Sequence, residues 1–206
     1  MAEVEQTLVH IALINTDKTI FIPGVGIGRA CARALAKGGA AGLMIADIDT
    51  SAAEETAAQC HEVATNQHFR VETTYVDITD DKSVLTATSM TIRRFGQIDY
   101  CVNCAGIGPN SNAEIADSDL SAYQRMLDVN ITGTFLVIRH ISDFMRGQEL
   151  RRLLSPLGDY RGSTRGAIVV LGSAASHVAM PVVSPYTAAK HAVVGMVKTV
   201  GKRPGH

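Results

Sequence analysis

The sequence has little of what marks a specialised class of protein. It has no tryptophan, four cysteines in 206 residues and nearly balanced charge, with 19 lysines and arginines against 20 aspartates and glutamates. Four cysteines do not make a disulfide framework in a chain of this length. The lack of a basic block argues against nucleic acid as a partner. A soluble protein that handles small metabolites fits this composition best.

Long apolar runs are also missing. No segment approaches the roughly 18 residues that a membrane-spanning helix requires. The N-terminus carries Glu3 and Glu5, where a secretory signal would carry positive charge. We therefore expect a cytoplasmic protein with no membrane partner. With 46% apolar residues, the chain can bury the core of a single domain over 1–206.

What the sequence does contain is an alternation of short apolar runs and longer helical patterns, which is typical of a parallel sheet with crossover helices. We expect strands at 19–22, 43–46, 71–76, 100–103 and 167–171, and helices at 27–37, 52–63, 82–95, 120 to about 147 and 186–200. The stretch SAAE, at 51–54, reads as a capping box at the start of the second helix. The pattern predicts a Rossmann-like, doubly wound α/β fold with three layers, α/β/α.

A glycine-rich stretch lies between the first expected strand and the first expected helix. In TIFIPGVGIGRACARALA, at 19–36, the glycines are Gly24, Gly26 and Gly28. Backbone N–H groups and the positive end of a helix at such a turn favour a phosphate. Asp47 follows at the end of the second strand, where its carboxylate can accept hydrogen bonds from ribose hydroxyls and repel a 2′-phosphate. This favours NAD over NADP, although Asp47 could also simply start a turn.

Two of the cysteines, Cys101 and Cys104, spell C-x-x-C. A redox pair of this kind has its first cysteine at a helix N-terminus, whereas this pattern is a strand that runs into a loop. No second C-x-x-C or H-x-x-x-H is present to complete a zinc shell. We expect no metal site, and we expect Cys31 and Cys60 to be small core residues of helices.

Four further stretches match a known family in order and spacing. They are YVDIT at 75–79, NCAG at 103–106, LDVNITGTF at 127–135 and GSAASHVAMPVVSPYTAAK at 172–190. Over most of 20 to about 198, the sequence resembles the classical short-chain dehydrogenase/reductases. The most specific element is Tyr186-x-x-x-Lys190 with Ser173 upstream. Residues four apart share a helix face, so Lys190 can place its ammonium beside the hydroxyl of Tyr186. A phenol is a poor proton donor or acceptor at neutral pH until a nearby cation stabilises the phenolate.

The resemblance implies an oxidoreductase that interconverts a carbonyl and a secondary alcohol on a small organic substrate with NAD or NADP. In the family, the tyrosine (Tyr186) exchanges the proton while the nicotinamide transfers hydride, and the serine (Ser173) polarises the same oxygen. The resemblance also implies that Lys190 binds the nicotinamide ribose and that Asn130 holds a water of the proton relay. The family commonly forms homodimers or homotetramers through the two helices that contain Asn130 and Tyr186.

The resemblance and the glycine turn together give a set of expected cofactor contacts. Asp77 and Ile78 match the pair that flanks the adenine, and NCAG matches the family's N-N-A-G with Cys104 in place of the second Asn. The full set is Gly24, Gly26, Ile27, Gly28, Asp47, Asp77, Ile78, Asn103, Ala105, Gly106, Tyr186 and Lys190.

The sequence departs from the family pattern near its N-terminus. The family loop reads T-G-x-x-x-G-x-G, and aligning Gly26-Ile27-Gly28 with its end places Phe21 at the Thr and Ile22 at the first Gly. Bulky Ile22 does not readily adopt positive φ. Residues 1–18 form an atypical N-terminal segment, in which 9–14 is an alternative first strand.

A second departure follows the catalytic motif. Only 16 residues follow Lys190, so the last strands of the family fold are missing from the expected sheet. We expect exposed apolar surface at Val193, Val194 and Val197 and a marginal or association-prone fold. The segment 151–166, with its Pro, Gly and mixed charges, predicts a surface insertion.

These departures leave two other hypotheses open. The chain could be a shortened, catalytically impaired member of the family that acts as a binding or interaction module. It could also be a splice product of a longer enzyme.

Overall fold

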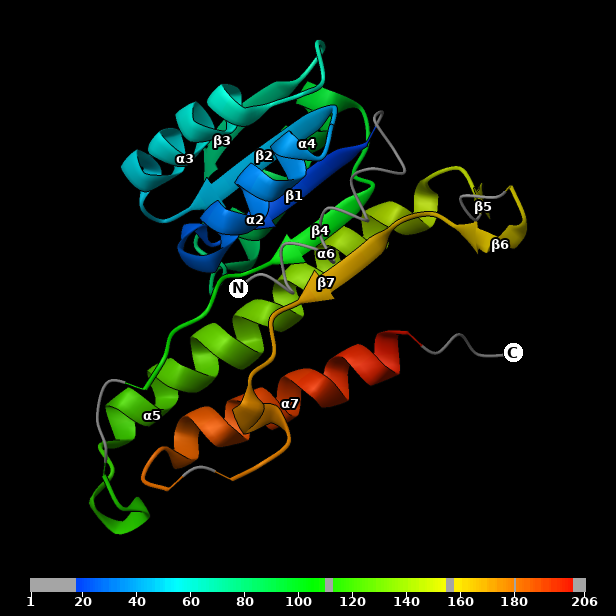
Figure 1. The fold of residues 1–206 in the computed structure, drawn as a ribbon. Helices are drawn as coiled ribbons and strands as arrows, with labels where there is room; N and C mark the ends of the chain where they lie inside the picture. The colour runs from blue at the N-terminus through cyan, green and yellow to red at the C-terminus, as the bar shows by residue number, and fades with distance from the viewer. Residues whose placement is uncertain (1–17, 110–112, 155–157, 180, 202–206) are drawn as a thin grey trace.

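The computed structural model describes residues 18–109, 113–154, 158–179 and 181–201. Its centre is a parallel sheet with the strand order β3-β2-β1-β4-β7. The strands are β1 (Thr19–Pro23), β2 (Gly42–Asp47), β3 (Arg70–Tyr75), β4 (Tyr100–Asn103) and β7 (Ala167–Val170). Each expected strand is present within one residue at either end. The doubly wound, Rossmann-like fold is confirmed (Figure 1).

Helices cover both faces of the sheet. On one face, α2 (Val25–Lys37) and α3 (Thr50–Val63) pack over a core that includes Ile20 and Ile22. On the other, α4 (Asp81–Phe95) and α6 (Thr134–Gly147) pack over a core that includes Phe21. Successive side chains of a strand point to opposite faces, so Phe21 and Ile22 fill the two cores and both are fully buried.

The long helix expected at 120 to about 147 is continuous, with an irregular middle. It consists of α5 (Leu120–Leu127), a π-helical segment η2 (Asp128–Gly133) and α6. The last helix, α7 (Ser184–Val200), packs along α5 and η2. Two short 3-10 helices, η1 (Ile115–Asp117) and η3 (Ala174–Ser176), precede α5 and α7, and η3 packs on α7. No helix of the described residues is both long and apolar enough to cross a membrane.

The expected capping box at 51–54 is wrong. The helix α3 begins at Thr50, and its N-cap is Asp49, whose side chain accepts a 3.0 Å hydrogen bond from the N–H of Ala52. Asp49 reaches this position because its own N–H donates to Oδ1 of Asp47 at 2.9 Å. An aspartate at the N-cap satisfies the free N–H groups of the first turn, so no serine is needed there.

The segment predicted as a surface insertion at 151–166 has regular structure on both sides of 155–157. It forms an antiparallel pair of strands, β5 (Arg151–Leu154) and β6 (Tyr160–Thr164), which is separate from the main sheet. In Figure 1 this hairpin projects beyond the end of α6. The guanidinium of Arg152 lies 5.2 Å from the centre of the Tyr160 ring across the pair.

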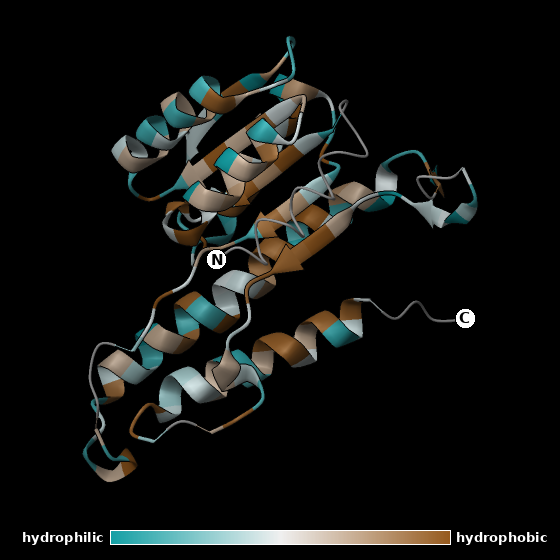
Figure 2. Ribbon diagram, viewed as in Figure 1, coloured by the Kyte–Doolittle hydropathy of each residue, from teal (hydrophilic) through white to brown (hydrophobic). Residues whose placement is uncertain are grey.

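The expectation of exposed apolar side chains on the last helix is partly wrong. Val193 is only 2% exposed, because it lies on the same face of α7 as the buried Ala189. Val194 is half-buried, and Val197 is 39% exposed. Figure 2 shows apolar residues concentrated on β7 and on the second half of α7. The alternative strand at 9–14 lies outside the described residues.

Candidate active site

A cleft of about 350 Å³ lies beyond the carboxyl ends of β1, β2 and β4, where open α/β sheets bind their ligands. Most of the expected cofactor residues line it, namely Gly24, Gly26, Ile27, Asp47, Asp77, Ile78, Ala105 and Gly106. These residues come from four separate parts of the sequence. The fold therefore brings them to one site.

The turn into the cleft is a single residue. Strand β1 runs to Pro23, α2 begins at Val25, and Gly24 between them has φ +91°. A Cβ atom at Gly24 would lie 2.4 Å from the backbone nitrogen of Ala105. Glycine is required here by both conformation and space. The positive φ falls at Gly24 and not at Ile22, so the bulk of Ile22 does not disturb the turn.

The N-terminus of α2 presents free donors to the cleft. A helix leaves its first four N–H groups without intrahelical partners. At this end, the N–H of Gly24 donates to the carbonyl of Ala46 at 2.8 Å, and that of Val25 donates to Oδ2 of Asp47 at 2.7 Å. The N–H groups of Gly26 and Ile27 meet no acceptor outside the helix among the described residues. These two donors suit an anion.

Asp47 starts the turn into α3 and also lines the cleft. Its Oδ1 accepts from Asp49 at the turn into α3, while Oδ2 accepts from Val25, and the side chain lines the cleft. A carboxylate has about four acceptor positions. Each oxygen of Asp47 therefore retains capacity to accept from a hydroxyl in the cleft.

Asp77 and Ile78 follow β3 at the far end of the cleft. Oδ1 of Asp77 accepts from the N–H of Thr79 at 2.9 Å and from its hydroxyl at 2.7 Å. Ile78 is buried against Gly133 of the π-helical segment. This closed turn places an apolar wall and a carboxylate side by side, which suits the flat ring and polar edge of an adenine.

Lys190 is a buried cation. Its Nζ donates a 3.0 Å hydrogen bond to the carbonyl of Leu171, which directly follows β7, and lies 5.7 Å from the centre of the Tyr186 ring. The residue is 8% exposed. Burial lowers the pKa of its ammonium below 10.5, because desolvation disfavours the charged form.

Asn130 fixes the loop that follows β4. From the π-helical segment, its side-chain amide donates to the carbonyl of Ile107 at 2.9 Å and its Oδ1 accepts from the N–H of Ile107 at 3.2 Å. A Cβ atom at Gly106 would lie 2.7 Å from Oδ1 of Asn130 and 3.8 Å from Nζ of Lys190. Gly106 is therefore the point at which the cleft meets the Lys190 and Asn130 side chains.

Ser173 lies at the start of η3, and it is held there by a capping box. Its Oγ accepts from the N–H of Ala175 at 3.2 Å, and its own N–H donates to Oγ of Ser176 at 3.1 Å. The hydroxyl hydrogen of Ser173 is left to donate. Within the described residues, no hydrogen bond joins Ser173 to Tyr186, and neither residue lines the 350 Å³ cleft.

Two of the expected cofactor residues lie behind the cleft. Asn103 is 1% exposed, its Oδ1 accepts from Ala105, and its Nδ2 is buried with no partner in the described part of the chain. Gly28 lies on α2 against Ile22 and Cys104, where a Cβ atom would come within 3.2 and 3.3 Å of their side chains. Both residues shape the walls of the cleft from behind.

The sequence reasoning missed several residues that line the cleft. They are Ile48, Val76, Thr79, Ile107, Arg125 and Val129. Cys104, in the NCAG stretch that the resemblance places against the cofactor, lines the cleft too. Most of the missed residues are sequence neighbours of residues that were identified. Arg125 and Val129 are four residues apart and share a face of α5 and η2, a spacing that could have revealed them. Arg125 is the one cation among the residues that line this cleft.

The described residues contain no group of three or more His, Cys, Asp or Glu that could hold a metal ion. Cys101 and Cys104 stay thiols, as do Cys31 and Cys60.

Comparison with known proteins agrees with this geometry. Residues 18–204 match the family described as short chain dehydrogenase. The chain belongs to this family. The curated short-chain dehydrogenase fogB of Aspergillus ruber is 50% identical over 175 residues, which cover 85% of this chain and 64% of that protein. Short-chain dehydrogenase RED2 of Pyricularia oryzae is 45% identical over 192 residues, or 90% and 69% of the two chains.

A solved structure shares the fold as well. Carveol dehydrogenase from Mycobacterium avium, crystallised in complex with NAD, superposes with a TM-score of 0.73 at 26% identity, covering 88% of this chain and 64% of that one. The chain thus spans 64–69% of the length of these relatives.

Proposed function

We propose that this chain carries the cofactor site and the catalytic residues of an NAD(P)-dependent oxidoreductase. It interconverts a carbonyl and a secondary alcohol on a small organic substrate. The observation that carries this proposal is the position of Gly106, which lines the cleft and also lies against Asn130 and Lys190. A ligand that fills the cleft therefore ends beside the ammonium of Lys190, which lies 5.7 Å from the centre of the Tyr186 ring.

The residues of the cleft fit a dinucleotide. The free N–H groups of Gly26 and Ile27 would hold the pyrophosphate, and the carboxylate of Asp47 would accept from the adenosine ribose. The turn at Asp77 and Ile78 would flank the adenine. The cofactor supplies or accepts a hydride. Because Asp47 repels a 2′-phosphate, we propose NAD as the preferred form, which agrees with the NAD complex of the carveol dehydrogenase.

The proton chemistry belongs to Tyr186. A phenol exchanges a proton poorly near neutral pH unless its anion is stabilised. The ammonium of Lys190, held by Leu171 at 3.0 Å, provides a fixed positive charge, and the attraction between the charges is stronger in a buried site than in water. Ser173, with its hydroxyl hydrogen left to donate, would polarise the substrate oxygen.

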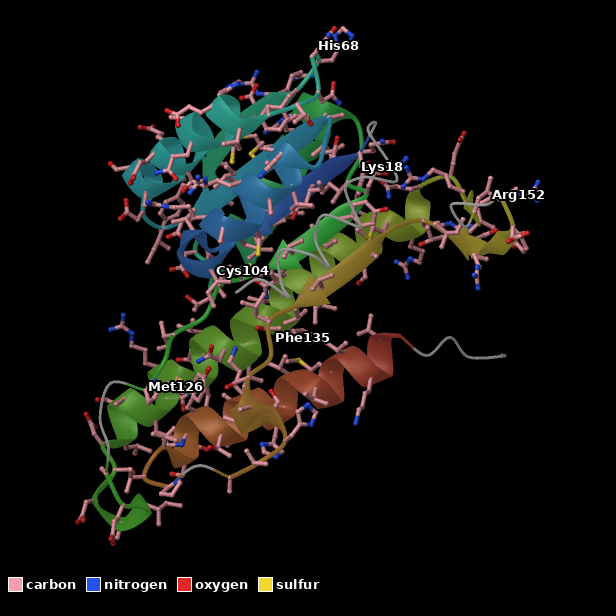
Figure 3. All side chains as sticks on the ribbon, in the orientation of Figure 1. Lys18, His68, Cys104, Met126, Phe135 and Arg152 are labelled. Carbon is pink, nitrogen blue, oxygen red and sulfur yellow. The ribbon has the colours of Figure 1, made fainter. Side chains whose placement is uncertain are left out.

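We further propose that the protein is a cytoplasmic homodimer or homotetramer. A groove of about 1010 Å³ runs between α4, α6 and α7, and it is lined by Phe135, Ile138, Met196 and other residues. Phe135 is 51% exposed on α6 (Figure 3). Large exposed aromatic side chains in an apolar groove are typical of protein interfaces. Light scattering at increasing protein concentration tests this association.

The activity is tested in two steps. Cofactor binding is measured from the fluorescence of NADH and NADPH on titration with the protein. Turnover is then measured with a panel of small ketones and secondary alcohols. We expect binding of NADH more tightly than NADPH, and turnover of some member of the panel. Absence of binding to either cofactor contradicts the proposal.

A second candidate function is a binding module without catalysis. It is favoured by the positions of Tyr186 and Ser173, neither of which lines the cleft. In that case NADH binds, while no substrate of the panel is turned over and Tyr186→Phe changes nothing that can be measured.

A further inference from the structure

Cys104 faces Cys31 and not its neighbour in the C-x-x-C motif. The Sγ atoms of Cys104 and Cys31 are 4.0 Å apart, although 73 residues separate them in the sequence. Cys101 belongs to the core on the opposite face of the sheet, together with Phe21. Residues three apart on a strand point to opposite faces, so the C-x-x-C spacing separates its two thiols and places Cys104 over α2.

The two facing thiols lie beside the phosphate-binding turn. Cys104 lines the cleft and contacts Gly28, and Cys31 lies one helical turn after Gly28 on α2. Figure 3 shows Cys104 beside the N-terminal end of α2, close to the end of β4. Cys31 is buried, whereas Cys104 is partly exposed. A small oxidant in the cleft therefore meets Cys104 first.

We propose that Cys31 and Cys104 form an oxidisable dithiol, and that its closure to a disulfide weakens cofactor binding in the adjacent cleft. The first part stands on the contact between the sulfur atoms. The second part rests on the proposed function of the cleft.

The oxidant is a peroxide. One peroxide molecule converts the thiol of Cys104 to a sulfenic acid and releases one water. The thiolate of Cys31 then attacks that sulfur, and the departing hydroxide takes up the proton lost by Cys31 as a second water. The two thiols lose two electrons, and these reduce the O–O bond of the peroxide.

Exposure to the cleft assigns the first role to Cys104, and the contact between the sulfur atoms favours Cys31 for the second. The S–H of Cys104 donates toward the sulfur of Cys31, and this contact lowers the pKa of Cys31. The same contact and burial raise the pKa of Cys104. Cys31 is thus the better thiolate, which suits attack on an oxidised sulfur, and Cys104 is the thiol that the cleft opens to peroxide.

Closure must move the walls of the cleft. A disulfide has an S–S length of about 2.05 Å, so the two sulfur atoms must approach by roughly 2 Å. Cys104 immediately precedes Ala105, whose backbone is in close contact with Gly24, and Gly106, which lies against Asn130. The cores on both sides are close-packed, so such a shift passes to these neighbours.

The cross-link is tested directly on the intact chain. The protein is treated with hydrogen peroxide, digested without reduction and analysed by mass spectrometry. We expect a peptide pair that joins Cys31 to Cys104, its loss in Cys31→Ser, and its retention in the matched control Cys101→Ser. Formation of a Cys101–Cys104 link, or no link at all while both peptides are recovered, overturns the proposal.

The effect on the cofactor is a separate measurement. We expect the oxidised chain to bind NADH roughly tenfold more weakly, as loss of one or two anion contacts would produce, with recovery after dithiothreitol. NADH should in turn slow cross-linking. Cys104→Asn, which restores the family residue, should bind NADH equally before and after peroxide, and its melting curve shows whether it folds.

The outcomes separate the two proposals. A cross-linked chain that binds NADH as tightly as the reduced chain overturns the regulatory part alone. A reduced chain that binds no NADH contradicts the proposed function, whatever the cross-link shows, and leaves the disulfide with no cofactor effect.

Discussion

The ammonium of Lys190 lies 5.7 Å from the centre of the Tyr186 ring, one turn earlier on α7, and it is held at the end of β7 by the carbonyl of Leu171. Both side chains come from α7, and the carbonyl of Leu171, at the end of β7, holds the ammonium of Lys190 in place. The distance between the Lys190 ammonium and the Tyr186 ring therefore depends on how α7 packs against the end of β7, as well as on the four-residue spacing along the helix.

Replacing Tyr186 by Phe should reduce kcat by about 10²- to 10⁴-fold, the range typical for loss of a general acid or base. The affinity for NADH should change by less than about twofold, because the hydroxyl contributes little to uniform binding. Steady-state kinetics and fluorescence titration measure the two. Tyr160→Phe, in the surface hairpin β5–β6, is the matched control and should leave both unchanged. Undiminished turnover by Tyr186→Phe refutes the role.

Two glycines of the turn should respond differently to alanine. Gly24→Ala introduces strain at φ +91° and a contact 2.4 Å from Ala105, so we expect a loss of about 2–4 kcal/mol in the free energy of unfolding. Gly26→Ala has open space around its Cβ, and alanine favours a helix, so the fold should keep its stability.

The same Gly26→Ala variant tests the phosphate site. Its methyl group would occupy the space in front of the free N–H groups, and NADH affinity should fall by about tenfold or more. Denaturant unfolding and NADH titration are done on the same samples. Unchanged NADH affinity places the pyrophosphate elsewhere.

Asp47→Asn should shift the preference between the two cofactors. The amide oxygen can still accept from the N–H of Val25, which lies 2.7 Å from Oδ2 in the parent chain, while the bond from the N–H of Asp49 to Oδ1 is lost. The negative charge that repels a 2′-phosphate is also gone. We expect the ratio of NADPH to NADH affinity to rise by about tenfold, or about 1.4 kcal/mol. Parallel titrations at fixed ionic strength measure it. A constant ratio indicates that Asp47 acts only as the start of the turn.

Lys190 should make stability depend on pH in the alkaline range. Burial lowers its pKa in the folded chain below 10.5, so between the folded pKa and 10.5 the unfolded chain holds more protons. The free energy of unfolding then rises with pH across this window, as the penalty for the buried charge disappears.

The variant Lys190→Met lacks the titrating ammonium, so its free energy of unfolding should depend less on pH. Urea unfolding of both proteins from pH 7 to 10.5 measures the difference in their free energies of unfolding. Both proteins contain the same tyrosines, whose titration therefore cancels in this difference. We expect the parent chain to gain stability relative to Lys190→Met as pH rises. A difference that is independent of pH contradicts the assigned pKa direction.

Much of the fold could be predicted from local patterns. The strands and helices were located because burial on a regular element repeats with a fixed period, and Tyr186 and Lys190 could be paired because four residues make about one helical turn. The capping box at 51–54 was predicted wrongly, since both Asp49 and Ser51 are good N-caps and only the turn at Asp47 selects between them. The hairpin at 151–166 was missed because its strands are short and mostly exposed.

The sequence by itself determined the doubly wound sheet and the family, because these depend on periodicity and on short motifs. Only the tertiary structure decided which groups meet. In the folded chain, Cys104 lies against Cys31 and away from Cys101. The chain turns at Gly24, and the carboxylate of Asp47 accepts a hydrogen bond from the N–H of Val25. Such contacts join residues far apart in the sequence, and they are fixed by the packing of α2 on the sheet, which no local pattern records.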